Sequence, residues 1–344
     1  MEYFHYQQPF VLESGETLPE ITIAYHSYGN LNATRDNVIW ICHALTANSD
    51  VEEWWPGMIG KGLLFDPEKH FIICANILGS CYGTTGPLSV NQNRGKLYYH
   101  SFPFTTIRDM VKAHILLRQH IDIAKIEVLI GGSIGGYQAL EWAIMEKEAI
   151  KNMLLLTTSA AESAWGIAVH TAQRLAIEAD NTWKETHAEA GIKGMKAARA
   201  IGMLTYRNYE VLVEKQTDPD INKTDNFKAS SYINHQGDKL VKRFNAYTYW
   251  MLTKAMDSHN IARGRASDLQ SVLKTIHHKT LIMGVSSDIL CPVQEQMFIA
   301  QNMPDATYIE ISSAYGHDGF LVETEKITQH VTNWLSKQAS LSKS

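Results

Sequence analysis

Long apolar runs and clustered positive charge are both missing from this sequence. No run of about 18 apolar residues occurs among the 344 residues, so no membrane-spanning helix is expected. The formal net charge is −5 and Lys and Arg form no cluster, which argues against nucleic acid or an anionic membrane as the main partner. The four cysteines show no CxxC spacing. This pattern predicts reduced thiols in a cytoplasmic protein.

Motifs that hold phosphates or metals are also absent. The sequence has no GxxxxGK(S/T) motif and no HExxH motif, and its Gly-rich segment at 131–136 lacks the GxGxxG register. His277 and His278 are adjacent, so they cannot share one metal ion on a strand. We therefore expect no metal and no bound cofactor. Hydrophobic residues, in contrast, make up 45% of the chain, which is enough for a sizeable buried core.

Short apolar, β-branched runs alternate with segments of helical periodicity. Several of these runs are apolar almost throughout, which is typical of strands buried on both faces of a sheet. The alternation predicts a mostly parallel sheet covered by helices on both faces. The expected strands are 21–29, 37–45, 70–78, 126–132, 152–159, 280–287 and 307–312, and the clearest helices are 105–121, 136–146 and 322–337.

This alternation stops over residues 160–278, where helical periodicity continues without a clear buried strand. Two consecutive domains are one interpretation. We favour a helical lid inserted into one catalytic domain made of residues 1–159 and 279–344, because the β/α segment after the interruption is too short to fold alone. The last residues, 336–344, are predicted to form a frayed tail.

The motif Gly131-Gly132-Ser133-Ile134-Gly135 joins an expected strand directly to an expected helix. A sharp turn at this place exposes a serine hydroxyl at the carboxyl edge of the sheet, and the flanking glycines relieve backbone crowding. The alternative is a serine that merely caps the helix. The motif in this context predicts an α/β-hydrolase fold with Ser133 as a nucleophile that accepts an acyl group.

A serine nucleophile needs a base and an acid that orients the base, in the chain order Ser, Asp or Glu, then His. Asp288 and His317 follow the last two expected strands in that order. An oxyanion hole needs two backbone donors, and we expect them at Ile134 and at Leu45, on the loop after the second strand. His43 precedes that loop, and we interpret it as a structural imidazole.

Several longer motifs occur together with these residues, between about Gln8 and Trp334. Through them the chain resembles the homoserine O-acetyltransferase family. They are Leu12-Glu13-Ser14-Gly15, His43-Ala44-Leu45-Thr46, Gly79-Ser80-Cys81-Tyr82-Gly83-Thr84-Thr85-Gly86-Pro87, Thr106-Ile107-Arg108-Asp109-Met110-Val111, Gln138-Ala139-Leu140-Glu141-Trp142, Leu204-Thr205-Tyr206-Arg207, Ser286-Ser287-Asp288 and Gly316-His317-Asp318-Gly319-Phe320.

The resemblance implies a ping-pong transfer of acetyl from acetyl-CoA, through Ser133, to the hydroxyl of L-homoserine, giving O-acetyl-L-homoserine for methionine synthesis. It also implies that Arg199 pairs with the carboxylate of the amino acid, that Tyr206 helps to fix this carboxylate or the acyl group, and that Asp318 accepts the ammonium. A homodimer formed through the lids is implied as well. The residues that bind CoA are left unassigned.

Three positions depart from the family pattern, namely Ser80, Tyr82 and Tyr137. We expect them close enough to the pocket to alter the choice of acyl group or acceptor. Use of succinyl-CoA, or of L-serine as acceptor, stays open within the family. An esterase is the main rival among enzymes, because water is the default acceptor in this fold. A binding protein without activity is disfavoured by the intact Ser133, Asp288 and His317.

Overall fold

The computed structural model describes residues 1–341, and its centre is an eight-stranded sheet with the order β1-β4-β6-β5-β9-β10-β11-β12. From β6 to β12 the neighbouring strands are parallel, while β1 and β4 run antiparallel to their neighbours. The strands are β1 (Glu2–Tyr6), β4 (Ile21–Tyr28), β5 (Val38–Cys42), β6 (Phe71–Ala75), β9 (Ile126–Gly132), β10 (Ile150–Leu156), β11 (Lys279–Val285) and β12 (Ala306–Ile311).

All seven strands expected from the sequence are present in this sheet. Strand β1 was not expected, and neither were two small hairpins outside the sheet. The hairpins are formed by β2 (Phe10–Val11) with β3 (Thr17–Leu18) and by β7 (Val90–Asn91) with β8 (Lys96–Leu97). Strand β1 lies at the sheet edge and most of its side chains are not buried, so it lacks the apolar run that marked the others.

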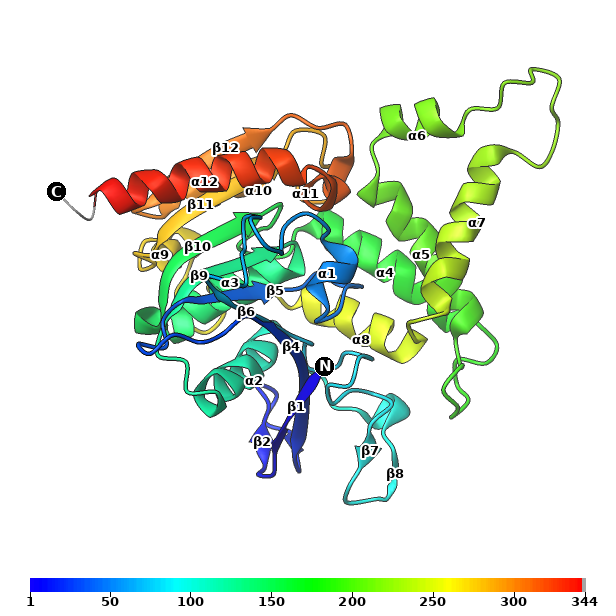
Figure 1. The fold of residues 1–344 in the computed structure, drawn as a ribbon. Helices are drawn as coiled ribbons and strands as arrows, with labels where there is room; N and C mark the ends of the chain where they lie inside the picture. Colours follow the sequence, from blue (N-terminus) through cyan, green and yellow to red (C-terminus); the bar gives the residue numbers. More distant parts are fainter. Residues whose placement is uncertain (342–344) are drawn as a thin grey trace.

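Helices cover both faces of the sheet, as the alternation of strands and helices predicted (Figure 1). Successive residues of β5 point to opposite faces: Trp40 packs in one buried cluster and Ile41 in the other. Three helices beside the sheet contribute side chains to the first cluster, together with several helices of the segment between β10 and β11. Two more contribute side chains to the second cluster, together with Phe320 of the short helix α11 (Gly319–Val322). The first three are α2 (Ile107–His120), α3 (Ile134–Met145) and α10 (Val293–Asn302), and the other two are α1 (Val51–Trp54) and α12 (Thr324–Leu341).

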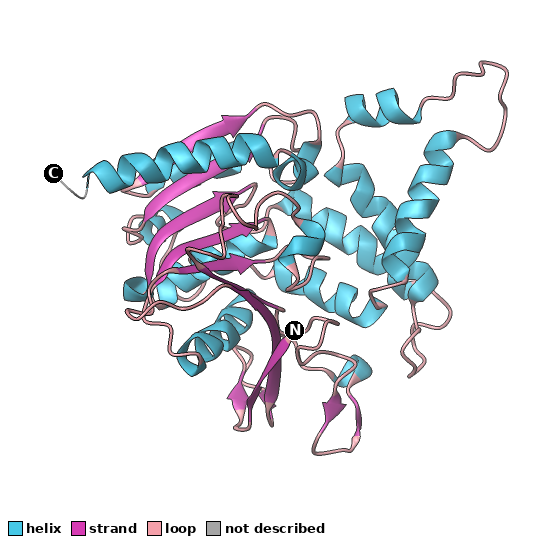
Figure 2. Cartoon of the chain, in the orientation of Figure 1, coloured by secondary structure: helices cyan, strands magenta, loops and turns pink. Residues whose placement is uncertain are grey.

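Six helices lie between β10 and β11, in the region expected to be a lid. Figure 1 shows most of them beyond one end of the sheet, and Figure 2 shows the arrowheads of the parallel strands pointing towards them. The carboxyl edge of the sheet therefore faces this helical insert. The helices are α4 (Ala164–Glu178), α5 (Ile192–Tyr206), α6 (Tyr209–Gln216), α7 (Lys228–Val241), α8 (Ala246–Asp257) and α9 (Leu269–Leu273).

The C-terminal end differs from the sequence-based expectation. Helix α12 continues to Leu341, so the prediction of a frayed tail is wrong for residues 336–341, while residues 342–344 lie outside the described part of the chain. The helix keeps its register on the sheet because Ile327, Val331 and Trp334 are buried against it. Within residues 1–341, no helix has both the length and the apolar content needed to cross a bilayer.

A network of ion pairs joins four distant segments of the chain. Arg108 on α2 pairs with Glu13 near the N-terminus (Nη1–Oε1 2.9 Å) and with Glu141 on α3 (Nε–Oε1 3.3 Å). Arg265, which follows α8, also pairs with Glu141 (Nη2–Oε2 2.7 Å). Arg263 completes the network through Glu13 (Nη2–Oε2 2.8 Å). The network therefore ties the return from the helical insert to the helices that flank the sheet.

Removal of the buried carboxylate in this network tests how much it contributes to stability. The side chain of Glu141 is 1% exposed, so Glu141→Ala leaves two guanidinium groups without their common partner. We expect the free energy of unfolding, measured in urea, to fall by about 3–5 kcal/mol. The control Glu68→Ala breaks the exposed pair with Lys61 and is expected to cost about 0–1 kcal/mol. Equal losses in the two variants would contradict a stabilising role for the network.

Candidate active site

Ser133 lies in the one-residue turn between β9 and α3, with a φ of 55° and a ψ of −127°. A positive φ is unfavourable for serine, so the surrounding packing must hold this backbone in place. The amide of Ser133 donates to the Leu156 carbonyl (3.1 Å), and the Thr158 hydroxyl donates to the Ser133 carbonyl (2.9 Å). The turn is thereby attached to β10 and to the residues that follow it.

Two glycines make the close approach of this turn possible. A Cβ atom on Gly131 would lie 2.1 Å from the carbonyl oxygen of Gly135, and a Cβ on Gly135 would lie 2.2 Å from the carbonyl oxygen of Cys42. Both are backbone contacts and cannot be relieved by a side-chain rotation. The glycine pattern seen in the sequence is therefore required by the packing of α3 against β5 and β9.

His317 and Asp288 form a buried hydrogen-bonded pair. Asp288 follows β11 and His317 lies in a short helical turn after β12, and His317 Nδ1 is 2.7 Å from Asp288 Oδ2. The other carboxylate oxygen of Asp288 accepts from the amides of Leu290 (2.8 Å) and Cys291 (2.9 Å). Because a carboxylate occupies Nδ1, that nitrogen carries the proton and Nε2 is free to act as a base.

Burial and charge act in opposite directions on the His317 imidazole. Burial disfavours the imidazolium and lowers the pKa, whereas the Asp288 carboxylate raises it through both its charge and its hydrogen bond. The charge of Asp318 adds to this effect, and the net result is a pKa of His317 above the ordinary value of 6.5. A base with a raised pKa accepts a proton more readily once it is in its neutral form.

One cavity of about 180 Å³ brings together most of the residues proposed from the sequence. Its walls come from the loop after β5, the turn before α3, the insert helix α5 and the segment after β12. Ile134 and Asp288 are not part of the lining, since Ile134 was proposed for its backbone amide and Asp288 lies behind His317. The predicted residues that line it are Leu45, Ser133, Arg199, Tyr206, His317 and Asp318.

Arg199 and Tyr206 interact on the cavity wall formed by α5. The guanidinium carbon of Arg199 is 5.3 Å from the centre of the Tyr206 ring, and this ring lies 6.0 Å from that of His317. Nε of Arg199 is buried without a hydrogen-bond partner among the described residues. A buried donor without a partner is costly, and an anionic ligand would satisfy it.

Asp318 supplies the negative charge of the cavity, but it already has a partner that the sequence did not reveal. Arg207 Nε lies 3.4 Å from Asp318 Oδ2. Burial raises the pKa of the Asp318 carboxyl, although the charges of Arg207, His317 and Arg199 lower it. A ligand ammonium at Asp318 would therefore share this carboxylate with Arg207.

Both ring nitrogens of His43 are engaged by backbone groups, one in its own loop and one in the loop after β6. Its Nδ1 is 2.8 Å from the Ala44 carbonyl oxygen, and its Nε2 accepts from the Ile77 amide at 3.2 Å. Burial lowers the pKa of His43 to about 4, so the imidazole is neutral. This geometry agrees with a structural histidine that orients the loop carrying Leu45, and it leaves no nitrogen for acid–base chemistry.

Two polar residues of the cavity were not identified from the sequence. His170 on α4 lines the cavity, with its Nδ1 2.9 Å from Asp257 Oδ1, and Arg243 lines it from the loop between α7 and α8. His170 lies on a helix and Arg243 in a loop, and the residues around each of them follow no local motif. Only the packing of the insert against the sheet could have revealed them.

None of the three departures from the family pattern is among the residues that line the cavity. Tyr137 is 1% exposed, its hydroxyl donates to Glu162 Oε2 (2.9 Å), and its ring stacks on that of His259 at 4.0 Å. Ser80 is buried in the loop after β6. Tyr82 contacts the site indirectly, because its hydroxyl accepts from Arg243.

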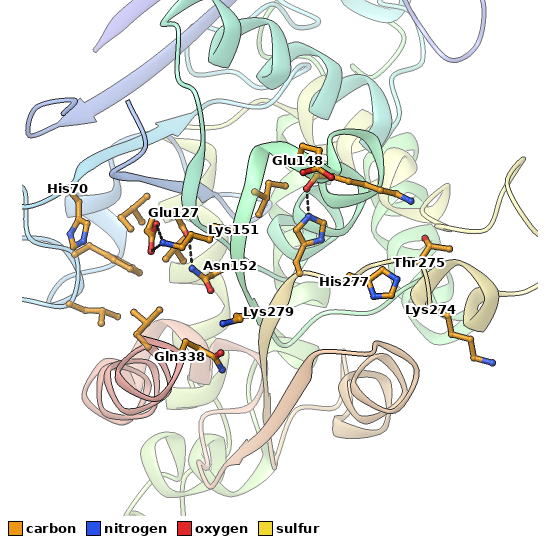
Figure 3. A pocket seen from close by; sticks show the side chains of 18 residues that line it. His70, Glu127, Glu148, Lys151, Asn152, Lys274, Thr275, His277, Lys279 and Gln338 are labelled. Carbon is orange, nitrogen blue, oxygen red and sulfur yellow. Dashed lines mark hydrogen bonds and ion pairs between the residues drawn. The ribbon is translucent and has the colours of Figure 1, made fainter. Parts of the chain in front are cut away.

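A larger cavity of about 860 Å³ lies at the opposite, amino-terminal edge of the parallel strands (Figure 3). In this cavity Lys151 forms an ion pair with Glu127 (2.8 Å), and the side-chain amide of Asn152 donates to the backbone carbonyl of Glu127. The described residues that line it include no serine or cysteine, and the hydroxyl of Thr275 donates to the Val272 carbonyl. Its described lining therefore offers no serine or cysteine nucleophile with an adjacent base, and the smaller cavity, which contains Ser133 and His317, is the candidate active site.

Known proteins resemble this chain over nearly its whole length. A family model described as the alpha/beta hydrolase fold matches residues 37–324. The homoserine O-acetyltransferase of Cyclobacterium marinum is 49% identical over 326 residues, covering 95% of this chain and 92% of that protein. The homoserine O-acetyltransferase of Trichormus variabilis is 44% identical over 336 residues, covering 97% and 93%.

Solved structures show the same similarity in three dimensions. The crystal structure of homoserine O-acetyltransferase from Bacillus anthracis superposes with a TM-score of 0.89 at 25% identity, covering 97% of this chain and 96% of that one. The crystal structure of esterase E22 superposes with a TM-score of 0.86 at 22% identity, covering 97% and 99%. The esterase likeness shows a shared fold alone.

The His317–Asp288 pair gives a prediction for the pH dependence of Ser133 acylation, measured as the burst of p-nitrophenol from p-nitrophenyl acetate. A base with a raised pKa stays protonated, and inactive, up to a higher pH. We therefore expect the burst rate to fall on acidification with a midpoint above the ordinary value of 6.5. In Asp288→Asn the midpoint should move down, because the charge that raised it is gone, and the rate should drop on the order of 10⁴-fold.

The control for this pH experiment is Asp305→Asn, which changes an exposed carboxylate before β12. It should keep both the rate and the midpoint of the wild type. If Asp288→Asn and the wild type share one midpoint, Asp288 does not set the pKa of the base.

Proposed function

Because the chain belongs to the homoserine O-acetyltransferase family of the α/β-hydrolase fold, we propose that it moves the acetyl group of acetyl-CoA to the side-chain hydroxyl of L-homoserine. The observation that carries this proposal is the pairing of charges beside the nucleophile. The half-buried Arg199, whose buried Nε has no partner among the described residues, and the carboxylate of Asp318 line the same cavity as Ser133. Together they suit a zwitterionic amino acid.

In the first half of the proposed reaction, the Ser133 hydroxyl attacks the thioester carbon while His317 takes its proton. The amides of Leu45 and Ile134 stabilise the negative oxygen, and Ile134 suits this role because the first amides of a helix have no acceptor within the helix. The carbon–sulfur bond then breaks, and the CoA sulfur leaves with the proton from His317. Asp288 stabilises the imidazolium formed in between.

In the second half, His317 takes the proton of the homoserine hydroxyl, whose oxygen attacks the acetyl-serine ester. The ester bond to Ser133 breaks, and Ser133 recovers the proton. Arg199 binds the carboxylate of the amino acid, Tyr206 fixes Arg199 through its ring, and Asp318 accepts the ammonium. Acetyl-CoA is a co-substrate in this scheme, and no resident cofactor is required.

Transfer to an amino acid, rather than to water, requires a protected acyl-enzyme. Ser133 and His317 are 6% and 4% exposed, and the insert helices cover the carboxyl edge of the sheet (Figure 1). Exclusion of water at this site lengthens the life of the ester until homoserine arrives. An esterase would instead need an open path for water to the same ester.

We also infer a homodimer that forms through the insert and works in the cytoplasm. Large apolar side chains on α4, α5 and α6 are exposed in the single chain, including Trp165, Leu175, Leu204 and Tyr209. Exposed apolar surface of this kind is typical of protein interfaces. All four cysteines are unpaired, as in proteins of a reducing compartment.

Release of free CoA thiol separates transfer from hydrolysis. With acetyl-CoA alone we expect at most one equivalent of thiol per active site, and with acetyl-CoA plus L-homoserine we expect steady release. Steady release without an amino acid would contradict the transferase and favour a hydrolase. The same assay with succinyl-CoA and with L-serine tests the two open alternatives within the family, and we expect neither to support comparable turnover.

The role of Arg199 is tested by separating the two half-reactions. Arg199→Ala should raise the KM for L-homoserine on the order of 10- to 100-fold, because a charged hydrogen-bond donor is lost, and leave the single-equivalent release of thiol unchanged. Arg199→Lys should recover only part of the loss, since lysine lacks the planar fork. The control Lys193→Ala removes an exposed cation of the same helix and should change neither value. Equal damage to both half-reactions would assign Arg199 a structural role.

A further inference from the structure

The active-site cavity is too small to hold a whole CoA molecule. Its volume of about 180 Å³ falls below the roughly 300–1,000 Å³ of pockets that enclose drug-sized ligands. If the acetyl group lies at Ser133, the phosphate-bearing end of the donor must therefore lie outside, at the mouth. Among the residues that line the cavity, Arg243 is the one whose side chain is exposed, so it marks this mouth.

Arg243 is held in a fixed position by two segments of the catalytic domain. Its Nη1 donates to the Thr46 carbonyl and to the Tyr82 hydroxyl, each at 2.5 Å. Tyr82 is itself fixed by an edge-on contact with the ring of Phe244, at 6.0 Å between centroids. Thr46 follows Leu45 in the loop after β5, so the guanidinium lies beside this loop and contacts the carbonyl of Thr46, not the amide proposed for the oxyanion hole.

The charge of Arg243 is not neutralised by the protein. None of the ion pairs among the described residues involves Arg243, and both of its hydrogen bonds use Nη1 and neutral oxygens. The charge of Glu53 raises the pKa of the nearby Tyr82, but its carboxylate accepts a hydrogen bond from the side-chain amide of Asn48 (2.8 Å) and not from Arg243. The Nε and Nη2 edge of the guanidinium is thus available to a ligand, in a chain whose net charge is negative.

We propose that Arg243 binds a phosphate group of the CoA donor at the mouth of the active site, with Tyr82 as its positioning residue. This inference rests on the proposed acetyl-CoA chemistry. A guanidinium edge matches two phosphate oxygens, and a guanidinium already oriented by Tyr82 and Thr46 loses less freedom on binding. Arg199 lies on α5 and serves the acceptor, so the two arginines divide the recognition of the two substrates.

Donors with and without phosphate groups test this proposal. The measured quantity is the donor concentration that gives half of the maximal single-turnover rate of thiol release, without any amino acid. With acetyl-CoA, Arg243→Ala should raise it about tenfold, and Arg243→Lys should recover part of the loss. With S-acetylpantetheine, which has no phosphate, the same variants should match the wild type. The maximal rate should stay unchanged with both donors.

Two further variants separate binding from folding. Tyr82→Phe keeps the ring contact with Phe244 but removes the hydroxyl that accepts from Arg243. It should raise the half-saturating concentration of acetyl-CoA by a smaller factor, again without an effect on S-acetylpantetheine. Lys242→Ala removes the neighbouring exposed cation, which does not line the cavity, and should leave both donors unaffected.

The outcomes distinguish this inference from the proposed function. Equal effects of Arg243→Ala and Tyr82→Phe on both donors, or no effect on acetyl-CoA, would overturn phosphate binding at Arg243. Absence of thiol release from acetyl-CoA by the wild type would instead overturn the proposed function itself.

Discussion

The site depends on the left-handed backbone of Ser133, which no serine adopts without support. Glycine at 131 and 135 lets β9, α3 and the end of β5 approach so closely that this conformation is held, and hydrogen bonds to Leu156 and Thr158 attach it to β10. The hydroxyl is therefore presented at the carboxyl edge of the sheet. The same edge carries Asp288 and His317, because β11 and β12 are parallel to β9 and end on the same side.

Charge is arranged around this serine in layers of different exposure. The Asp288–His317 pair is buried, and the Asp288 carboxylate accepts hydrogen bonds from one imidazole and two backbone amides. Arg199 lies on the cavity wall with an unpartnered donor, whereas Arg243 lies at the mouth and is oriented by neutral oxygens only. The half-buried cation of Arg199 suits a small acceptor that enters completely, and the exposed cation of Arg243 suits a donor that enters only in part.

Local patterns were sufficient to predict most of the fold and the three residues of the proposed triad. Short apolar, β-branched runs marked seven strands, and Asp288 and His317 were identified from chain order and from their positions after the last two strands. Strand β1 was not predicted, because this edge strand has few buried side chains and therefore no apolar run. His170, Arg243 and the Arg207–Asp318 pair could not be predicted, since they depend on how the insert helices pack against the sheet. The contacts of Tyr137 could not be predicted for the same reason, because its partners Glu162 and His259 are distant in sequence.

The proposed mechanism requires a covalent acetyl group on Ser133 that only an amino acid removes efficiently. Its most direct test is intact-protein mass spectrometry after mixing with acetyl-CoA, followed by peptide mapping. We predict one added acetyl group, located on the peptide that contains Ser133, absent in Ser133→Ala, and lost within one turnover when L-homoserine is added. An acetyl group that persists in Ser133→Ala, or product formation from acetyl-CoA and L-homoserine by that variant at the wild-type rate, would contradict the account.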